Sequence, residues 1–126
     1  MKSILVVEDD IIISLLYEKI LESAGYHIIR AHNGMEAVEK FRLLQVKPDI
    51  ILMDHRMPVK NGIEASKEIM AINKNSKIIF LSADPKVQKE ALSIGAVHFL
   101  EKPFSIKTLI RIIKEKLEFS SYIEAA

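Results

Sequence analysis

The sequence lacks cysteine and tryptophan, and it has only four glycines and four prolines among 126 residues. The absence of cysteine excludes disulfides, thiolate catalysis and zinc binding through sulfur. Neither sign of charge is in excess, since 18 Lys and Arg oppose 17 Asp and Glu and leave a formal net charge of +1. This balance gives no long-range field that attracts nucleic acid or an anionic membrane. Apolar runs of membrane-spanning or signal-peptide type are also missing. We therefore expect a cytoplasmic protein without nucleic-acid or membrane partners.

Apolar runs of strand length alternate with amphipathic segments along the chain. The runs are Ile4–Val7, Tyr26–Ile29, Ile50–Met53, Ile78–Leu81 and Val97–Leu100. Because they are apolar on both faces, they are typical of parallel strands that are covered on both sides. The intervening segments carry apolar stripes at helical spacing, one of which consists of Ala37, Val38, Phe41 and Leu44. This β-α pattern, repeated five times, predicts an α/β fold with a doubly wound parallel sheet and right-handed crossovers.

The length and composition indicate one domain. Hydrophobic residues make up 49% of the chain and charged residues 28%, which is a normal globular mix. We expect this domain to span residues 1–119, followed by a short C-terminal tail at residues 120–126. Because no long linker precedes this short tail, we expect a protein that acts alone rather than a fragment of a longer one.

Chemically reactive side chains directly follow four of the five predicted strands. They are Glu8, Asp9 and Asp10 after the first strand, Asp54 after the third, Ser82 after the fourth and Lys102 after the fifth. In doubly wound sheets, ligands gather at the carboxyl ends of the strands. We therefore expect these side chains to meet at one edge of the sheet.

The acids Glu8, Asp9 and Asp54 would repel one another in a single pocket, so the pKa of at least one carboxyl group should rise. A hard divalent cation such as Mg²⁺ or Mn²⁺ removes this conflict, since it prefers carboxylate oxygens. Taken alone, the acidic triplet is equally consistent with a solvated loop, and Asp10 is expected to cap the helix that begins near Ile11. The further acid at a second strand end favours a metal site.

Lys102 and Ser82 extend this cluster into a site that fits an acyl phosphate. Lys102 offers a point charge for a phosphoryl oxygen, and Lys102–Pro103 is a candidate cis peptide bond. Ser82 offers a hydroxyl, although each residue alone is common at a turn. A carboxylate such as Asp54 can attack phosphorus without a general base because it is already ionised. The sequence has no nucleophile elbow, no histidine pair at metal-ligand spacing and no glycine-rich phosphate loop.

These residues lie in four segments, ILVVEDD, DIILMDHRMPVKNG, IIFLSA and GAVHFLEKPF, which follow one another in this order. With these segments the chain, from Lys2 to about Glu118, resembles the receiver domain of two-component response regulators, and in particular the single-domain chemotaxis regulators. The resemblance implies a flavodoxin-like fold with five helices and the strand order 2-1-3-4-5.

The resemblance also implies roles for individual residues. Asp54 would be phosphorylated by a histidine kinase or a histidine phosphotransfer protein. Asp9 would bind Mg²⁺ directly and Glu8 through water, with the backbone carbonyl of Arg56 as a further ligand. Lys102 would contact the phosphoryl group, and Ser82 would sense it.

Phe99, three residues before Lys102, would be the switch aromatic that moves inward when Ser82 is drawn toward the phosphoryl group. The readout face would comprise the fourth helix, fifth strand and fifth helix. These correspond to Pro85–Ile94, Val97–Leu100 and Ser105–Leu117. The alternative interpretation of Phe99 is an inward-facing strand residue without a switch role.

Two further sets of residues next to the site are candidates for tuning and docking. The resemblance implies that Arg56 and Asp84 flank the path of the hydrolytic water, and we hypothesise that their pairing slows loss of the phosphoryl group. An Arg56→Ala/Asp84→Ala variant with an unchanged dephosphorylation rate would contradict this. The residues expected to dock the phosphodonor are Ile11, Ile12, Ile13, Pro103 and Phe104.

Other functions remain open from the sequence. A metal-dependent phosphohydrolase of haloacid-dehalogenase type uses the same chemistry, but it carries its nucleophile after the first strand within a DxD pattern. A degenerate receiver that only binds partners would not need the complete set of acids, Lys102 and Ser82. We expect a regulator of a downstream protein, monomeric or dimerising upon phosphorylation, and not an enzyme beyond its own phosphorylation and slow dephosphorylation.

Overall fold

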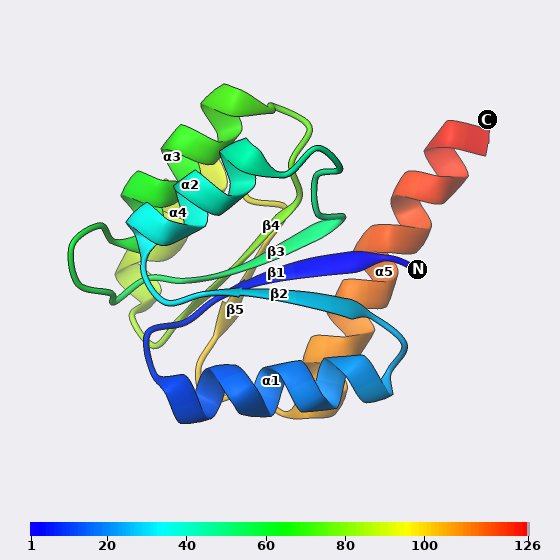
Figure 1. The fold of residues 1–126 in the computed structure, drawn as a ribbon, viewed down its shortest axis with the longest axis horizontal. Coiled ribbons are helices and arrows are strands. Elements are labelled where there is room, and N and C mark those ends of the chain that lie inside the picture. The colour runs from blue at the N-terminus through cyan, green and yellow to red at the C-terminus, as the bar shows by residue number, and fades with distance from the viewer. Residues whose placement is uncertain (126) are drawn as a thin grey trace.

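Five strands form one fully parallel sheet in the computed structural model, which describes the backbone of residues 1–125 and the side chains of residues 1–118 (Figure 1). The strands are β1 (Ser3–Val7), β2 (His27–Ala31), β3 (Ile50–Asp54), β4 (Ile78–Ser82) and β5 (His98–Glu101). Their spatial order is β2-β1-β3-β4-β5, and every neighbouring pair is parallel. The predicted fold class and strand order are confirmed.

Helices cover both faces of this sheet. They are α1 (Ile11–Ser23), α2 (Gly34–Leu43), α3 (Gly62–Ile72), α4 (Gln88–Ser93) and α5 (Ile106–Ala125), with a short 3-10 helix η1 (Pro85–Val87) before α4. Helices α1 and α5 lie on one face and α2, α3 and α4 on the other (Figure 1). Within the described residues, no helix combines the length and the apolar character that crossing a membrane requires.

The core consists of two apolar layers, one on each face of the sheet. Along β1, Ile4 packs in the cluster that contains Leu109 of α5, whereas Leu5 packs in the cluster that contains Phe41 of α2. All four side chains are fully buried. Because successive strand residues point to opposite faces, a strand covered on both sides must be apolar at every position. This explains why the central strands are continuous apolar runs.

The boundaries of several elements differ from those predicted. Strands β2 and β5 each begin one residue later, and β2 continues to Ala31, whose carbonyl accepts a hydrogen bond from Glu8 N–H at 3.0 Å. The fourth helix is divided into η1 and α4, and Leu44 lies just beyond α2. Helix α5 runs on to Ala125. The predicted tail at residues 120–126 falls where side chains are not described, so its boundary stays a prediction.

Polar side chains fix the start of three helices. The carboxylate of Asp10 accepts hydrogen bonds from the backbone N–H groups of Ile12 and Ile13, at 2.9 and 3.1 Å, as the sequence predicts for a cap. Asn33 caps α2, and Asn61 caps α3 in a capping box. The cap at Asp10 starts α1 directly after β1, which leaves the two preceding acids at the sheet edge.

Candidate functional site

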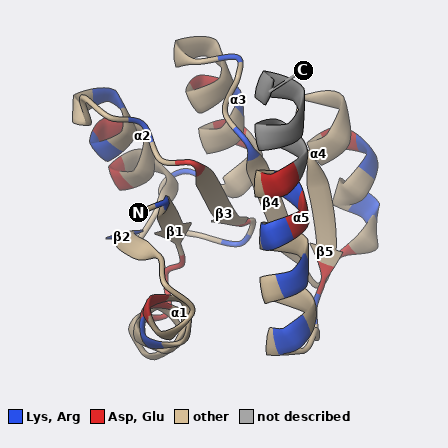
Figure 2. Cartoon of the chain, turned by 90° about the vertical axis from the view of Figure 1, so that its right-hand side faces the viewer, with Lys and Arg blue, Asp and Glu red and all other residues tan. Residues whose placement is uncertain are grey.

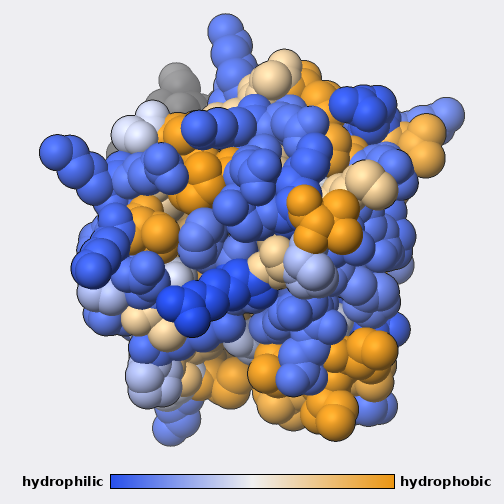
Figure 3. Space-filling model, turned by 90° about the vertical axis from the view of Figure 1, so that its left-hand side faces the viewer, coloured by the Kyte–Doolittle hydropathy of each residue, from blue (hydrophilic) through white to orange (hydrophobic). Residues whose placement is uncertain are grey.

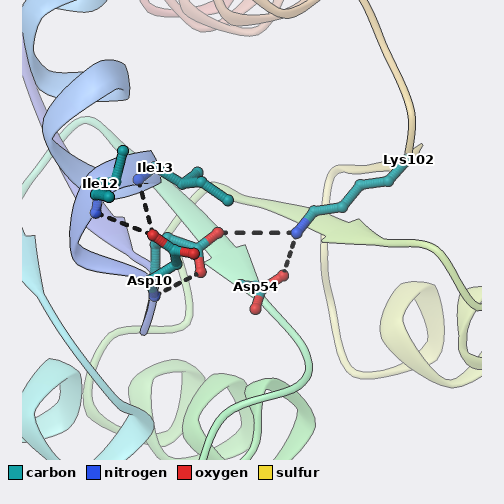
Figure 4. A network of polar contacts seen from close by, with 6 residues as sticks. Asp10, Ile12, Ile13, Asp54 and Lys102 are labelled. Carbon is teal, nitrogen blue, oxygen red and sulfur yellow. Dashed lines mark hydrogen bonds and ion pairs between the residues drawn. The ribbon is translucent and has the colours of Figure 1, made fainter.

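The carboxyl ends of four strands bring the predicted side chains to one edge of the sheet. Asp54 and Ser82 close β3 and β4, while Glu8 follows β1 and Lys102 follows β5. The backbone of the last strand is tied to its neighbour, since Lys102 N–H donates to the Ser82 carbonyl at 2.9 Å. Figure 4 shows the Lys102 side chain extending across this edge to Asp54.

Three carboxylates gather at the centre of this edge. Glu8, Asp9 and Asp54 each offer a carboxylate oxygen, and these atoms lie within 4.8 Å of one another. Glu8 and Asp54 are only 3% and 6% exposed, whereas Asp9 is exposed. The cation in contact with them is Lys102, whose Nζ lies 2.7 Å from Asp54 Oδ1 and 3.8 Å from Glu8 Oε1. Among the described residues, Lys102 therefore forms ion pairs with two of the three acids, Glu8 and Asp54.

Burial and crowding change the pKa of the groups in this cluster. Burial raises the pKa of Glu8 to about 7; the backbone N–H of Asp10 opposes this effect and the charge of Asp54 adds to it. Burial also raises the pKa of Asp54, against the opposing effect of Lys102. Burial is the largest single effect on Lys102 and would lower its pKa, but the hydrogen bond to Asp54 and the negative charges of Asp54 and Glu8 together outweigh burial and raise the pKa. Lys102 therefore stays protonated near neutral pH.

The carboxylate cluster fits a hard divalent cation. Glu8 Oε1 is buried and, within the part of the chain that the structure describes, receives no hydrogen bond. A buried acceptor of this kind needs a partner. With two further carboxylates beside it, the oxygen-only donor set is the one that Mg²⁺ prefers. The backbone carbonyl of Arg56, the fourth predicted ligand, stays a prediction.

Ser82 is buried beside the cluster, and its hydroxyl oxygen already takes part in a hydrogen bond. Its Oγ accepts a hydrogen bond from the backbone N–H of Asp84 at 3.0 Å. Asp84 in turn accepts from the backbone N–H of Lys86 at 2.9 Å and so caps η1. No ion pair joins Arg56 to Asp84 within the described residues. The predicted pairing is not formed in this structure, in which Asp84 Oδ1 caps η1, and its effect on dephosphorylation stays a hypothesis.

A row of three rings connects the acceptor loop to the predicted switch residue. His55, directly after Asp54, lies with its ring centroid 5.7 Å from that of Phe80. Phe80 stacks on the half-buried Phe99 at 6.2 Å, with 16° between the ring planes. Sequence reasoning missed His55 and Phe80. No sequence signal could have found this stacking, since it depends on the register of β4 against β5, which places Phe80 opposite Phe99.

The start of α1 presents an apolar surface next to the site. Within this helix only Ser14, Tyr17 and Leu21 are buried. The exposed apolar residues are Ile11, Ile12, Ile13, Leu15 and Leu16. Figure 3 looks onto the carboxyl edge of the sheet and shows a hydrophobic patch at its bottom, where α1 lies. The predicted docking residues Ile11, Ile12 and Ile13 therefore belong to an exposed apolar patch, and their contact with a phosphodonor stays a prediction.

A groove of about 420 Å³ lies between α1 and the loop after β5. Its lining includes Ile13, Pro103 and Phe104 from the predicted docking set, together with Lys102. The other two docking candidates do not line it. The Lys102–Pro103 peptide bond is cis, as predicted. Sequence reasoning missed Tyr17, which also lines the groove, although it follows Ile13 by four residues and so shares its side of the helix.

Known proteins share both this sequence pattern and this fold. The sequence model of the family described as "Response regulator receiver domain" matches residues 4–114. The chain is 40% identical over 117 residues to chemotaxis protein CheY of Thermotoga maritima, which covers 90% of this chain and 96% of that protein. The structure of chemotaxis protein CheY4 of Vibrio cholerae is 31% identical in sequence and has a TM-score of 0.85. The match covers 93% of this chain and 99% of that one. Response regulator TrrA of T. maritima, solved in complex with Mg(2+)-BeF, is 35% identical in sequence and has a TM-score of 0.84. The match covers 93% of this chain and 100% of that one.

Proposed function

Because the chain belongs to the response-regulator receiver family, we propose that Asp54 accepts a phosphoryl group from a histidine kinase or a histidine phosphotransfer protein. One observation carries this proposal: the buried carboxylate of Asp54 lies within 4.8 Å of two further carboxylates and 2.7 Å from Lys102. The alternative, a phosphohydrolase of haloacid-dehalogenase type, would need its nucleophile after β1. Asp54 instead closes β3.

The geometry supports a direct in-line transfer. One carboxylate oxygen of Asp54 forms a bond to phosphorus as the P–N bond of a phosphohistidine breaks. The phosphohistidine carries a proton on its other ring nitrogen, so a neutral imidazole leaves with the electron pair. Mg²⁺ or Mn²⁺, held by Glu8, Asp9, Asp54 and the Arg56 carbonyl, would neutralise the carboxylates and the phosphoryl oxygens. Lys102 is placed to shift its contact from Asp54 to a phosphoryl oxygen. Because Asp54 itself is modified, we infer a switch with slow self-dephosphorylation rather than an enzyme that turns over a substrate.

The proposed output depends on Ser82 and Phe99. Phosphorylation would draw the Ser82 hydroxyl away from Asp84 N–H, and Phe99 would move inward in response. The face formed by α4, β5 and α5 would then present a changed surface to a downstream protein. Figure 2 shows Lys and Arg residues along α4 and α5 on this side. We propose that the chain acts there as a monomer or as a phosphorylation-dependent dimer.

The proposed function is tested with a small donor. Incubation with Mg²⁺ and acetyl phosphate should produce a base-labile adduct that intact-protein mass spectrometry detects, and chelation of Mg²⁺ should prevent it. Asp54→Asn keeps the size of the side chain but removes the nucleophile, so it should form no adduct. Failure of the unchanged protein to form an adduct, or equal labelling of both proteins, would contradict the proposal.

Docking of a protein donor is expected to depend on Ile12, which is 79% exposed at the start of α1. Ile12→Asp should lower the rate of phosphotransfer from a histidine phosphotransfer domain about tenfold, because a charge would be buried in an apolar contact. Stopped-flow or radiolabel transfer assays measure this rate. The matched control is Leu43→Asp on α2, where the leucine is 81% exposed and lies away from the site. Equal rates for the two variants would argue against docking on α1.

A further inference from the structure

The groove between α1 and the loop after β5 begins directly beside the acceptor. Lys102, which lines it, holds Asp54 Oδ1 at 2.7 Å. Most of the remaining lining is apolar, with Ile13 and Leu16 from α1, Phe104 from the loop after β5 and Ile106 from the start of α5. In Figure 4 the Ile13 side chain extends from α1 on the side that faces Lys102. The groove is therefore continuous with the place where a phosphoryl group would bind.

The chemistry of the lining favours a neutral, apolar occupant. A free anion in the groove would meet Lys102, but this cation is already paired with Asp54 and lies 3.8 Å from Glu8. The three nearby carboxylates would repel a second negative charge. A ring or branched alkyl group meets no such conflict, because it would contact Leu16, Ile106 and the ring of Phe104. The volume of about 420 Å³ lies within the range of small-ligand sites.

We propose that this groove binds the apolar leaving group of a small acyl-phosphate donor while its phosphoryl group lies against Asp54 and Lys102. The proposal rests on the proposed function, since Asp54 must be the acceptor. A carboxylate oxygen of Asp54 forms the new bond to phosphorus as the bond between phosphorus and the acyl oxygen breaks. The leaving carboxylate departs with the electron pair, and no proton or further reactant is needed. A donor with an aromatic acyl group would contact the groove, whereas acetyl phosphate is too short to fill it.

Leu16 and Leu15 provide a matched pair for the test. Both lie on α1, at 52% and 39% exposure, but only Leu16 lines the groove. Because both side chains are already partly in water, replacement by Asn should leave the fold intact. Initial rates of Asp54 labelling are measured with benzoyl phosphate and with acetyl phosphate, and their ratio is compared between proteins. Intrinsic reactivity of the two donors cancels in this comparison.

The ratio of the benzoyl phosphate rate to the acetyl phosphate rate is expected to fall about tenfold in Leu16→Asn and to stay unchanged in Leu15→Asn. Leu16→Trp, which fills the groove without adding polarity, should lower the ratio as well. An unchanged ratio in both Leu16 variants, or an equal fall in Leu15→Asn, would overturn the groove assignment while leaving acetyl phosphate labelling intact. Absence of labelling with either donor in the unchanged protein would overturn the proposed function and this inference together.

Discussion

Without a divalent cation, the free energy of unfolding is expected to fall by about 3 kcal/mol as the pH rises from 4.5 to about 7. Folding raises the pKa of Glu8 from 4.5 to about 7, so between these values the folded state binds more protons than the unfolded chain. Stability must then decrease with increasing pH across this window. The raised pKa of Asp54 acts in the same direction. Urea denaturation at a series of pH values in the presence of a chelator measures the effect.

Glu8→Gln is the matched control, because it keeps the size of the side chain and removes its titration. His98 has a pKa that is lowered by burial and contributes a slope of opposite sign in both proteins, so it cancels in the difference. The variant should lose most of the pH dependence. Mg²⁺ should restore stability to the unchanged protein near pH 8 and do so much less in Glu8→Gln, because binding to the folded state alone stabilises it. Equal slopes for the two proteins would show that Glu8 is not the titrating group.

Much of the fold could be predicted because its physical causes are local. Ile50 and Ile51 pack on opposite faces of the sheet, and such a strand must be apolar at every position. The same reasoning placed Asp54 and Lys102 at one edge, since parallel strands end together. Boundaries were less certain, as Leu44 shows: its apolar character fits the stripe of α2, but the backbone leaves the helix there.

What the sequence could not provide depends on side chains from distant segments. The groove that contains Tyr17 exists only because α1 packs beside the loop after β5. The stacking of Phe80 on Phe99 likewise required the register of β4 against β5. Each of these features follows from packing that periodicity does not encode.

Gly62→Ala is expected to destabilise the protein by about 2–4 kcal/mol and to disturb the acceptor site at the same time. A Cβ atom at this position would lie 2.3 Å from the carbonyl oxygen of Asp54, 2.9 Å from the Cα of His55 and 3.0 Å from the ring of Phe80. Two of these contacts are backbone atoms, and Phe80 is fully buried, so none can move at low cost. Chemical denaturation measures the loss of stability.

Gly34→Ala separates the effect on the site from the effect on the fold. A Cβ atom there would lie 2.4 Å from the carbonyl oxygen of Lys60, an equally severe backbone contact that does not involve Asp54. Both variants should therefore lose stability, but only Gly62→Ala should displace the backbone of Asp54, which carries the acceptor carboxylate. Its Mg²⁺ affinity, measured by calorimetry at a temperature where both variants are folded, is expected to fall about tenfold, because a site that is displaced by a fraction of an ångström loses its geometry. If Gly62→Ala lost stability by the expected amount but kept its Mg²⁺ affinity, the loop after β3 would accommodate the clash without moving the Asp54 side chain.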